Sequence, residues 1–231
     1  MTNEQLIWDY LIDKIKNPYG VAAVMGNLMA ESNLNQTCTT GLAKTGISSV
    51  GNYIAFSDTG KHDFANDGVA FGLVQWCYKT RKQGFLDYVR SKHTSICDID
   101  AQLEYLVKEM SESYKPVWSA VCNATNIREA SDIVMLKYEK PANTSESFKQ
   151  RRAAYGEEYY DMFMTAENTD KEKFVRVTAN NVNVRVGPGK DKNAICRVNK
   201  GAKFQYYGTD DNGWNGIVLW LHPDFSEVII E

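Results

Sequence analysis

The chain has 231 residues, of which 43% are hydrophobic and 12% aromatic, so it can form one large domain or a medium domain and a small one. Its formal net charge of -3 at pH 7 leaves no global basic field to hold nucleic acid or an anionic membrane surface. No hydrophobic run is long enough for membrane insertion, and the acidic, amphipathic N-terminus does not read as a signal peptide. We therefore expect a soluble globular protein made in the cytoplasm.

The predicted helices lie in the first two thirds of the chain. Periodic apolar residues predict helices near 2–16, 81–92, 98–112, 126–139 and 146–163. A further helix begins at Asn17-Pro18, because asparagine is a good N-cap and proline at the first helical position fixes φ where its missing N–H costs nothing. Between residues 33 and 70 the helical period gives way to a region rich in Gly, Ser, Thr and Asn, with room for a short hairpin. Such a long irregular stretch is typical of a groove wall or lid.

A different pattern follows the polar, aperiodic stretch 165–173, which we interpret as a linker. In the segment 182–186, Val182, Val184 and Val186 alternate with polar residues, as in a half-buried strand. Further short strands are predicted at 194–198, 203–208, 214–220 and 226–230. The fold class is therefore α+β multidomain, with a mainly helical domain at 1–164 and a small all-β, SH3-like barrel at 174–231.

Several common reaction centres are absent from the sequence. It has no GxSxG elbow, Walker loop or HExxH motif, and its three histidines show no metal-ligand spacing. The five cysteines are odd in number, widely spaced and free of CxxC, so we expect buried free thiols and neither a disulfide framework nor a zinc site. A catalytic thiol would need an arbitrary choice among them. We predict that no metal or cofactor is required.

One glutamate lies at the border of an apolar helix face. In "VAAVMGNLMAESNLN", residues 21–35, Glu31 projects close to the stripe formed by Val21, Val24 and Leu28. Burying the edge of an ionised group costs free energy unless partners or water satisfy it. Glu31 is therefore either a tethered structural acid or a functional one.

A second carboxylate, Asp67, stands beside Gly68 in "NDGVAFGLVQW", residues 66–76. Cleavage of a glycosidic bond uses a protonated carboxylic acid and a second carboxylate that activates water or stabilises the developing positive charge. Glu31 at the apolar boundary suits the acid, and Asp67 in a polar turn suits the group that stays ionised.

Four ordered motifs support this interpretation: "GNLMAESNLN", "NDGVAFGLVQW", "YKTRKQGFLDYV" and "YEKPANTSESFKQRRAAYGEEYY". Over residues 5–163 the chain resembles the phage tail lysozyme family, a branch of the lysozyme-like superfamily that cleaves peptidoglycan glycan chains. The resemblance implies a largely helical fold with a groove between two lobes. It also implies that Glu31 is the catalytic glutamate and that Asp67 is the aspartate shortly before the groove segment.

The family's GLxQW segment maps to Gly72, Leu73, Gln75 and Trp76, which are expected along the substrate groove. We also expect Trp76 and Tyr78 to stack on sugar rings, whose faces are apolar.

Some alternatives remain open within this site. Related goose-type lysozymes have an aspartate where this chain has Cys77, so Asp58 and Asp63 are alternatives to Asp67. Arg81 and Lys82 begin a helix, and we assign Tyr138, Glu139 and Pro141 to a helix terminus outside the site because proline stops the helix there.

The C-terminal segment "VNVRVGPG", followed later by Gly213-Trp214, resembles the bacterial SH3-type domains. The resemblance implies recognition of peptidoglycan, and the alternative is a module that serves stability or dimerisation. The predicted wall-binding residues are polar or aromatic: Asn183, Arg185, Tyr206, Tyr207 and Trp214.

Together these features predict a phage-type endolysin. Its N-terminal domain would be an N-acetylmuramidase acting on the β-1,4 bond after N-acetylmuramic acid, and its C-terminal domain would hold it on the wall. It would wait in the host cytoplasm for release, with a holin as the implied partner. The alternatives are a lytic transglycosylase or an N-acetylglucosaminidase on the same substrate, and, outside the enzymes, a wall-binding or phage tail structural protein.

Overall fold

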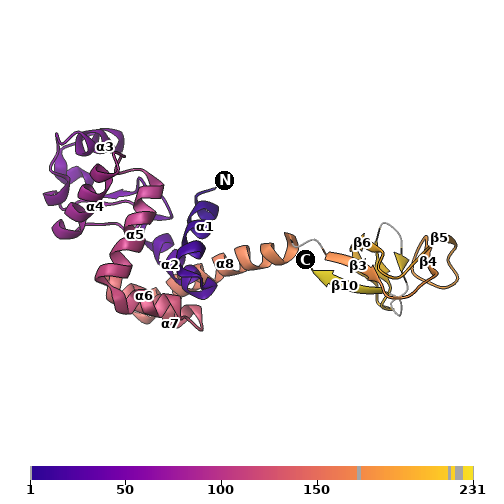
Figure 1. The fold of residues 1–231 in the computed structure, drawn as a ribbon. Coiled ribbons are helices and arrows are strands. Elements are labelled where there is room, and N and C mark those ends of the chain that lie inside the picture. Colours follow the sequence, from indigo (N-terminus) through magenta and orange to yellow (C-terminus); the bar gives the residue numbers. More distant parts are fainter. Residues whose placement is uncertain (1, 171–172, 218–219, 222–225, 231) are drawn as a thin grey trace. The chain divides into compact units, whose positions relative to one another are not determined.

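The chain divides into two compact units, Met1–Met164 and Thr165–Glu231. The computed structural model describes the backbone of residues 2–170, 173–217, 220–221 and 226–230, and the side chains of residues 2–164 and 174–217 (Figure 1). The first unit is mainly helical, and the second contains short strands. This order agrees with the mainly helical N-terminal region and small C-terminal sheet region expected from the sequence.

The helical segments of the first unit surround one core. They are α1 (Asn3–Ile15), α2 (Pro18–Ser32), η1 (Leu42–Thr45), α3 (Val50–Asp58), η2 (Phe64–Asn66), α4 (Lys79–Ser91), α5 (Ile99–Ser113), α6 (Lys115–Cys122), α7 (Ile127–Ile133), η3 (Val134–Glu139) and α8 (Glu146–Asp170). η1 and η2 are single 3₁₀ turns, and η3 is π-helical and continues α7. Every predicted helix has a counterpart here, whereas α3 and α6 were not predicted. α3 interrupts the stretch that we expected to be irregular, and its N-terminus is capped by the Ser49 side chain, which accepts from Asn52 N.

α2 begins where the sequence predicted. The side chain of Asn17 accepts hydrogen bonds from the backbone N–H groups of Tyr19 and Gly20 at 3.0 and 3.3 Å, and Pro18 is the first helical residue. The Asn17 amide also donates to the carbonyl of Ala124 at 2.9 Å. The cap therefore also ties the start of α2 to the segment that follows α6.

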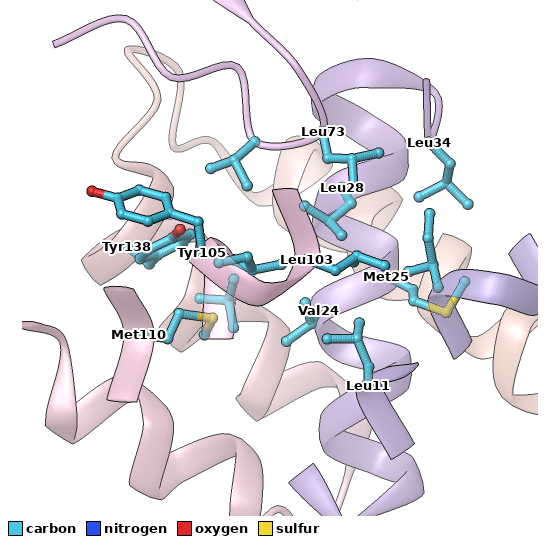
Figure 2. Packing of buried hydrophobic residues seen from close by; sticks show 14 of the residues in the cluster. Leu11, Val24, Met25, Leu28, Leu34, Leu73, Leu103, Tyr105, Met110 and Tyr138 are labelled. Carbon is cyan, nitrogen blue, oxygen red and sulfur yellow. The ribbon is translucent and has the colours of Figure 1, made fainter. Parts of the chain in front are cut away.

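α2 is the central helix of the first unit and is buried on all sides between Gly20 and Leu28. Figure 2 shows Val24, Met25 and Leu28 of α2 among Leu11 of α1 and Leu103 of α5. Asn27 is a buried polar residue of this stretch, and Glu31 near the C-terminal end of the helix is partly exposed. The helix thus carries Glu31 from the core to the surface.

Small residues let α8 lie directly against α2. A Cβ atom on Gly26 would come within 2.3 Å of the carbonyl oxygen of Arg152, and a Cβ on Gly156 would lie 2.7 Å from the carbonyl oxygen of Ala22. Two backbones can approach this closely only where side chains are absent. The close crossing places Arg152 beside the last turns of α2.

A short two-stranded sheet closes the long segment between α2 and α4. β1 (Thr39–Thr40) pairs antiparallel with β2 (Ala70–Phe71). The pairing joins the two ends of the Gly- and Ser-rich stretch, so it is not the short local hairpin that we expected. Ser32 at the end of α2 donates to the carbonyl of Leu73 at 2.9 Å and so fixes the loop after β2 against Glu31's helix.

The strands of the second unit form two sheets. They are β3 (Lys173–Val177), β4 (Val182–Arg185), β5 (Ala194–Val198), β6 (Lys203–Gln205), β7 (Gly208–Thr209), β8 (Asn215–Gly216), β9 (Trp220–Leu221) and β10 (Ser226–Ile230). One sheet has the order β10-β3-β6 and the other the order β5-β4-β9-β8-β7, with antiparallel pairing throughout. β3 was not predicted.

The predicted alternation in β4 is partly confirmed. Val182 and Val184 are buried with Val175, Val177 and Ile217, but Val186 is 57% exposed. The register between β4 and β5 shifts between Val184 and Arg185, so the last valine leaves the buried face.

Two further expectations about this region need revision. No ladder joins the two sheets in the part of the chain that the structure describes, so a closed SH3-like barrel is not confirmed. The polar stretch 165–173 is helical as far as Asp170, because it contains neither glycine nor proline and α8 can continue through it. Among the described residues, no helix is long and apolar enough to span a bilayer.

Candidate active site

Glu31 lines a cavity of about 350 Å³ in the first unit. The end of α2 and Thr40 of β1 form part of the wall. Gln75 and Tyr78, from the loop between β2 and α4, form another part. Ala70 of β2, Arg81 of α4 and the segment 139–142, which begins at the last residue of η3, complete the lining. Segments far apart in the sequence therefore meet around one carboxylate.

Arg152 of α8 holds Glu31. Its Nη2 donates to Oε1 of Glu31 at 2.6 Å, while Nη1 donates to the backbone and side-chain oxygens of Asn27 at 3.3 and 3.2 Å. The side chain of Arg152 is 5% exposed and that of Glu31 is 21% exposed. The guanidinium gives Glu31 a charged hydrogen bond, and its buried position fixes the carboxylate at the cavity.

Glu139 contributes a second carboxyl group to the same cavity. It ends the π-helical segment η3 and precedes Lys140, which has a left-handed backbone with φ of 53°. Its Oε1 is buried and has no hydrogen-bond partner within the described residues. Burial, together with the negative charge of Glu31, raises the pKa of Glu139 to about 8.

A third carboxylate, Glu109 of α5, lies in a closed network next to the cavity. Arg81 binds it in a bidentate pair, Nε to Oε1 and Nη2 to Oε2, both at 2.8 Å. Tyr138 and Trp76 also donate to its Oε2 at 2.6 and 3.1 Å. Burial would raise the pKa of Glu109, but these hydrogen bonds lower it. The network is satisfied internally, and it fixes Arg81 in the wall of the cavity.

Two residues predicted from the GLxQW segment shape the loop that forms part of the cavity wall. Gln75 lines the cavity, and its side-chain amide donates to the carbonyls of Cys38 and Gly72 at 2.9 and 3.0 Å. Gly72 is buried and has φ of 80°, and a Cβ there would come within 2.7 Å of Oε1 of Gln102. Gly72 therefore forms the turn and does not line the cavity.

Trp76 and Tyr78 have opposite surroundings. Tyr78 is 62% exposed and lines the cavity, as a sugar-stacking side chain requires. Trp76 is fully buried and stacks on Phe85 with ring centroids 4.6 Å apart. The predicted direct contact of Trp76 with substrate is therefore wrong for this structure, because neither face of its ring reaches the cavity.

Asp67 does not line the cavity that contains Glu31. Its side chain is 3% exposed and pairs with Lys82, with Nζ to Oδ1 at 2.5 Å. Tyr53 OH, His62 Nε2 and the backbone N–H of Val69 lie within 2.7 to 2.9 Å of its oxygens. Burial alone would raise the pKa of Asp67, but Lys82 and these hydrogen bonds lower it.

The two alternative aspartates, Asp58 and Asp63, form hydrogen bonds outside the cavity that Glu31 lines. Asp58 accepts from Ser95 Oγ at 2.5 Å and from the N–H of Ile96 at 2.9 Å, and Asp63 accepts from the amide of Asn66 at 2.8 Å. Neither lines the cavity beside Glu31. Among the residues predicted as carboxylates of the site, the structure brings only Glu31 to this cavity.

In the second unit, three of the predicted wall-binding residues lie together. Asn183, Arg185 and Trp214 line a cavity of about 200 Å³ with Lys190. The side chain of Asn183 accepts from Arg197 Nε at 3.1 Å, and Arg185 donates to the carbonyl of Lys192 at 2.5 Å.

The two predicted tyrosines lie outside this cavity. Tyr207 is 79% exposed, whereas Tyr206 is partly buried, with its hydroxyl 2.9 Å from that of Thr209.

The spacing of the cysteines and the acidic side chains bears on whether the described part of the chain could hold a metal. No cluster of three or more His, Cys, Asp or Glu side chains that could hold a metal occurs in the described ranges. The five cysteines are free, but Cys77 and Cys196 are exposed, so the expectation of buried thiols is wrong for these two.

Sequence reasoning did not single out Arg152, and it assigned Glu139 and Pro141 to a helix terminus outside the site, whereas both line the cavity with Glu31. Arg152 shares a helical stripe with the buried Tyr159 and Phe163, so a cation there needs an anionic partner by the same argument that singled out Glu31. Glu139 follows the buried Met135 by four residues, which is a weaker signal of the same kind. Neither sequence pattern predicts which charged side chain lies next to Arg152 or Glu139 in the fold.

Comparison with known proteins gives a family match and a distant relative. Residues 2–163 match the family model of the phage tail lysozymes. The chain is also similar to Morphogenesis protein 1 of Bacillus phage B103, with 22% identity over 223 residues, which cover 90% of this chain and 53% of that protein. The chain thus spans about half the length of this relative.

Proposed function

The chain belongs to the phage tail lysozyme family, and on that premise we propose that it hydrolyses the glycan strands of bacterial peptidoglycan as an N-acetylmuramidase. The observation that carries this proposal is the position of Glu31 in a cavity whose wall includes the exposed ring of Tyr78. Such an arrangement suits a sugar stacked on the aromatic side chain with its glycosidic oxygen near the carboxyl group.

In this proposal Glu31 delivers a proton to the glycosidic oxygen as the bond to C1 breaks. Donation of this proton avoids the release of an unstable alkoxide, and general acid catalysis of this kind contributes roughly 10² to 10⁴ in rate. Arg152 fixes the direction of the carboxyl group through its hydrogen bond to Oε1. No metal or cofactor takes part.

Mass spectrometry of digested peptidoglycan tests the bond and the reaction. We expect fragments with N-acetylmuramic acid at the reducing end. Anhydro-muramic ends would identify a lytic transglycosylase, and reducing N-acetylglucosamine ends would identify a glucosaminidase. The release of no fragments at all would contradict an enzymatic role and favour a wall-binding or structural protein.

We propose further that the protein is an endolysin released from the host cytoplasm through a holin. A second candidate role, in the phage particle itself, is favoured by the similarity to a relative named as a morphogenesis protein. Purified virions distinguish the two roles. An endolysin is absent from virions and accumulates in infected cells until lysis, whereas detection of the chain in washed virions by mass spectrometry would support the particle role.

For the second unit we propose binding to the bacterial wall through the cavity lined by Asn183, Arg185 and Trp214. Polar groups around an aromatic ring suit a peptide or sugar of the wall. The full-length Glu31→Gln variant should sediment with intact walls without degrading them. Adding Arg185→Ala should weaken this sedimentation, whereas unchanged sedimentation would contradict a role for this cavity in wall binding.

A further inference from the structure

We propose that Glu139 is the second carboxyl group of the catalytic site and that it stores the proton which Glu31 delivers to the glycosidic oxygen. The inference rests on the proposed glycan hydrolysis and adds a residue to it. It also replaces Asp67, the second carboxylate expected from the sequence, by a group that lines the same cavity as Glu31.

The hydrogen bonds of the two glutamates differ in a way that assigns these roles. Glu31 accepts the short charged hydrogen bond from Arg152. Glu139 receives no such bond, and its Oε1 is buried without a partner in the described part of the chain. An ionised carboxylate with an unsatisfied buried oxygen is costly, whereas a protonated carboxyl group is tolerated there. The geometry therefore places the negative charge on Glu31 and the proton on Glu139.

The surrounding charges favour the same distribution. The charged groups that act on Glu139 come from four elements: Glu31 on α2, Arg81 on α4, Glu109 on α5 and Arg152 on α8. Lys140, which also lines the cavity, lies next to it in the chain. When Glu139 is neutral, the two carboxylates balance the two guanidinium groups, and ionisation of Glu139 adds an uncompensated buried charge. Consistent with this, burial and the charge of Glu31 raise the pKa of Glu139 to about 8.

A proton held on Glu139 would supply the proton that Glu31 must donate to the glycosidic oxygen. Arg152 makes an ion pair with the Glu31 carboxylate in the free protein, but a general acid must carry a proton when the bond breaks. Glu139 can supply that proton, so the pair together holds a single proton at neutral pH. The backbone fixes Glu139 for this task, since it ends a π-helical segment and the chain turns at Lys140 and Pro141.

The reaction then balances as follows. The proton moves from Glu139 to Glu31, which leaves Glu139 as a carboxylate. Glu31 donates this proton to the glycosidic oxygen as that oxygen separates from C1 with the bonding electron pair. Water adds its oxygen to C1 and releases a proton to Glu139, which restores the pair. The net reaction consumes one water molecule and one glycosidic bond, with no oxidant, reductant or further co-reactant.

The Glu139→Gln variant tests the proposal, because glutamine mimics neutral Glu139 in shape but cannot release a proton. We expect the rate of release of reducing ends from peptidoglycan to fall on the order of 10²-fold at neutral pH. We also expect the activity that remains to lie at lower pH, because Glu31 must then take its proton from solvent. The exposed Glu157 of α8 offers a matched control, and Glu157→Gln should leave both the rate and the pH profile unchanged.

A second measurement does not depend on turnover. Carboxyl carbon-13 NMR of glutamate-labelled protein should show one glutamate that titrates near pH 8, and Glu139→Gln should remove this signal. Glu31→Gln should move the titration to lower pH, because it removes the negative charge that repels ionised Glu139.

The outcomes separate this inference from the proposed function. Cleavage by the wild-type protein together with an unchanged rate and pH profile in Glu139→Gln would overturn the role of Glu139 and leave glycan hydrolysis intact. Titration of Glu139 in the ordinary range of a glutamate, near 4.5, would likewise overturn it. Absence of any cleavage by the wild-type protein would overturn the proposed function itself.

Discussion

The Glu31–Arg152 and Asp67–Lys82 ion pairs each join a carboxylate to a buried cation, but the two carboxylates have different surroundings. Asp67 is 3% exposed and has hydrogen-bond partners on both oxygens, and Lys82 is fully buried. Glu31 is 21% exposed and borders a cavity that also contains Glu139. A buried pair with every lone pair engaged stabilises one local structure, whereas a carboxylate at a cavity can exchange a proton with a ligand.

The largest expected effect is the loss of turnover in Glu31→Gln. The variant keeps nearly the same volume but has no proton to donate, so the rate should fall by roughly 10² to 10⁴. The melting temperature and the sedimentation with intact walls should change little. If turnover of the folded variant stayed near the wild-type rate, Glu31 would be a structural acid and the contrast with Asp67 would disappear.

The second effect is on stability. Asp67→Asn leaves Lys82 as a buried cation without its anion, which should destabilise the first unit by about 3–5 kcal/mol. Chemical denaturation at neutral pH measures this difference. Because the pKa of folded Asp67 lies below its ordinary value of 3.8, the stabilisation is present above that pH and is lost as the pH falls further. Turnover per folded molecule should persist, and a loss comparable to that of Glu31→Gln would instead identify Asp67 as catalytic.

A substitution at Gly26, which belongs to neither ion pair, should move Arg152 away from Glu31. In Gly26→Ala the new Cβ would overlap the carbonyl oxygen of Arg152, so α8 must move away from α2 at a cost of about 1–3 kcal/mol. We expect lower stability together with lower turnover. Gly51→Ala is a suitable control because nothing lies within 4 Å of a Cβ at that position. A folded Gly26→Ala variant with full activity would show that Arg152 is dispensable.

A smaller effect should appear in the pH dependence of stability. The ordinary pKa of a glutamate is 4.5 and that of folded Glu139 is about 8, so the folded protein binds this proton more tightly than the unfolded chain. Wild-type stability contributed by this group therefore falls as the pH rises from 4.5 through about 8. Glu139→Gln should melt at least about 2–4 °C higher than the wild type at about pH 9 and nearly equally at about pH 4. Equal differences at both pH values would contradict a protonated Glu139.

The smallest effect concerns the exposed ring at the cavity. Tyr78→Ala removes a stacking surface worth about 0.5–1.5 kcal/mol, so KM for glycan fragments should rise roughly two- to tenfold. kcat should stay near the wild-type value because no carboxyl group moves. Tyr19→Ala is a control at a tyrosine that does not line this cavity. A fall in kcat without a change in KM would place Tyr78 in the chemical step and not in binding.

Local patterns predicted much of the fold. The cap of α2 at Asn17, the burial of Val24 and Leu28 and the alternation of Val182 with Asn183 all depend on neighbours within a few residues. Short elements were missed, such as α6, whose eight residues are too few for the apolar period to stand out. The predicted buried face of segment 182–186 was wrong at Val186, because the register shift before it depends on pairing with β5.

The candidate site was predicted only in part. Trp76 and Tyr78 illustrate the reason, because one is buried and the other is exposed. Both are aromatic and stand two positions apart, yet Trp76 donates to Glu109 in the core and Tyr78 faces the cavity. Residue type and spacing alone do not distinguish these positions. The packing of α4 and α5 against the loop determines which ring is buried, because Trp76 contacts Phe85 and Tyr105.

The sequence by itself determined that Glu31 ends an apolar helix, since helical periodicity is a local property. It also determined the family, through motifs that stand in order along the chain. Only the tertiary structure decided which charges meet. Arg152 lies 121 positions from Glu31, and Glu139 is separated from it by most of the first unit. Backbone contact at Gly26 and the turn after η3 bring these groups together, because long-range packing and not local spacing sets the distance between side chains on different helices.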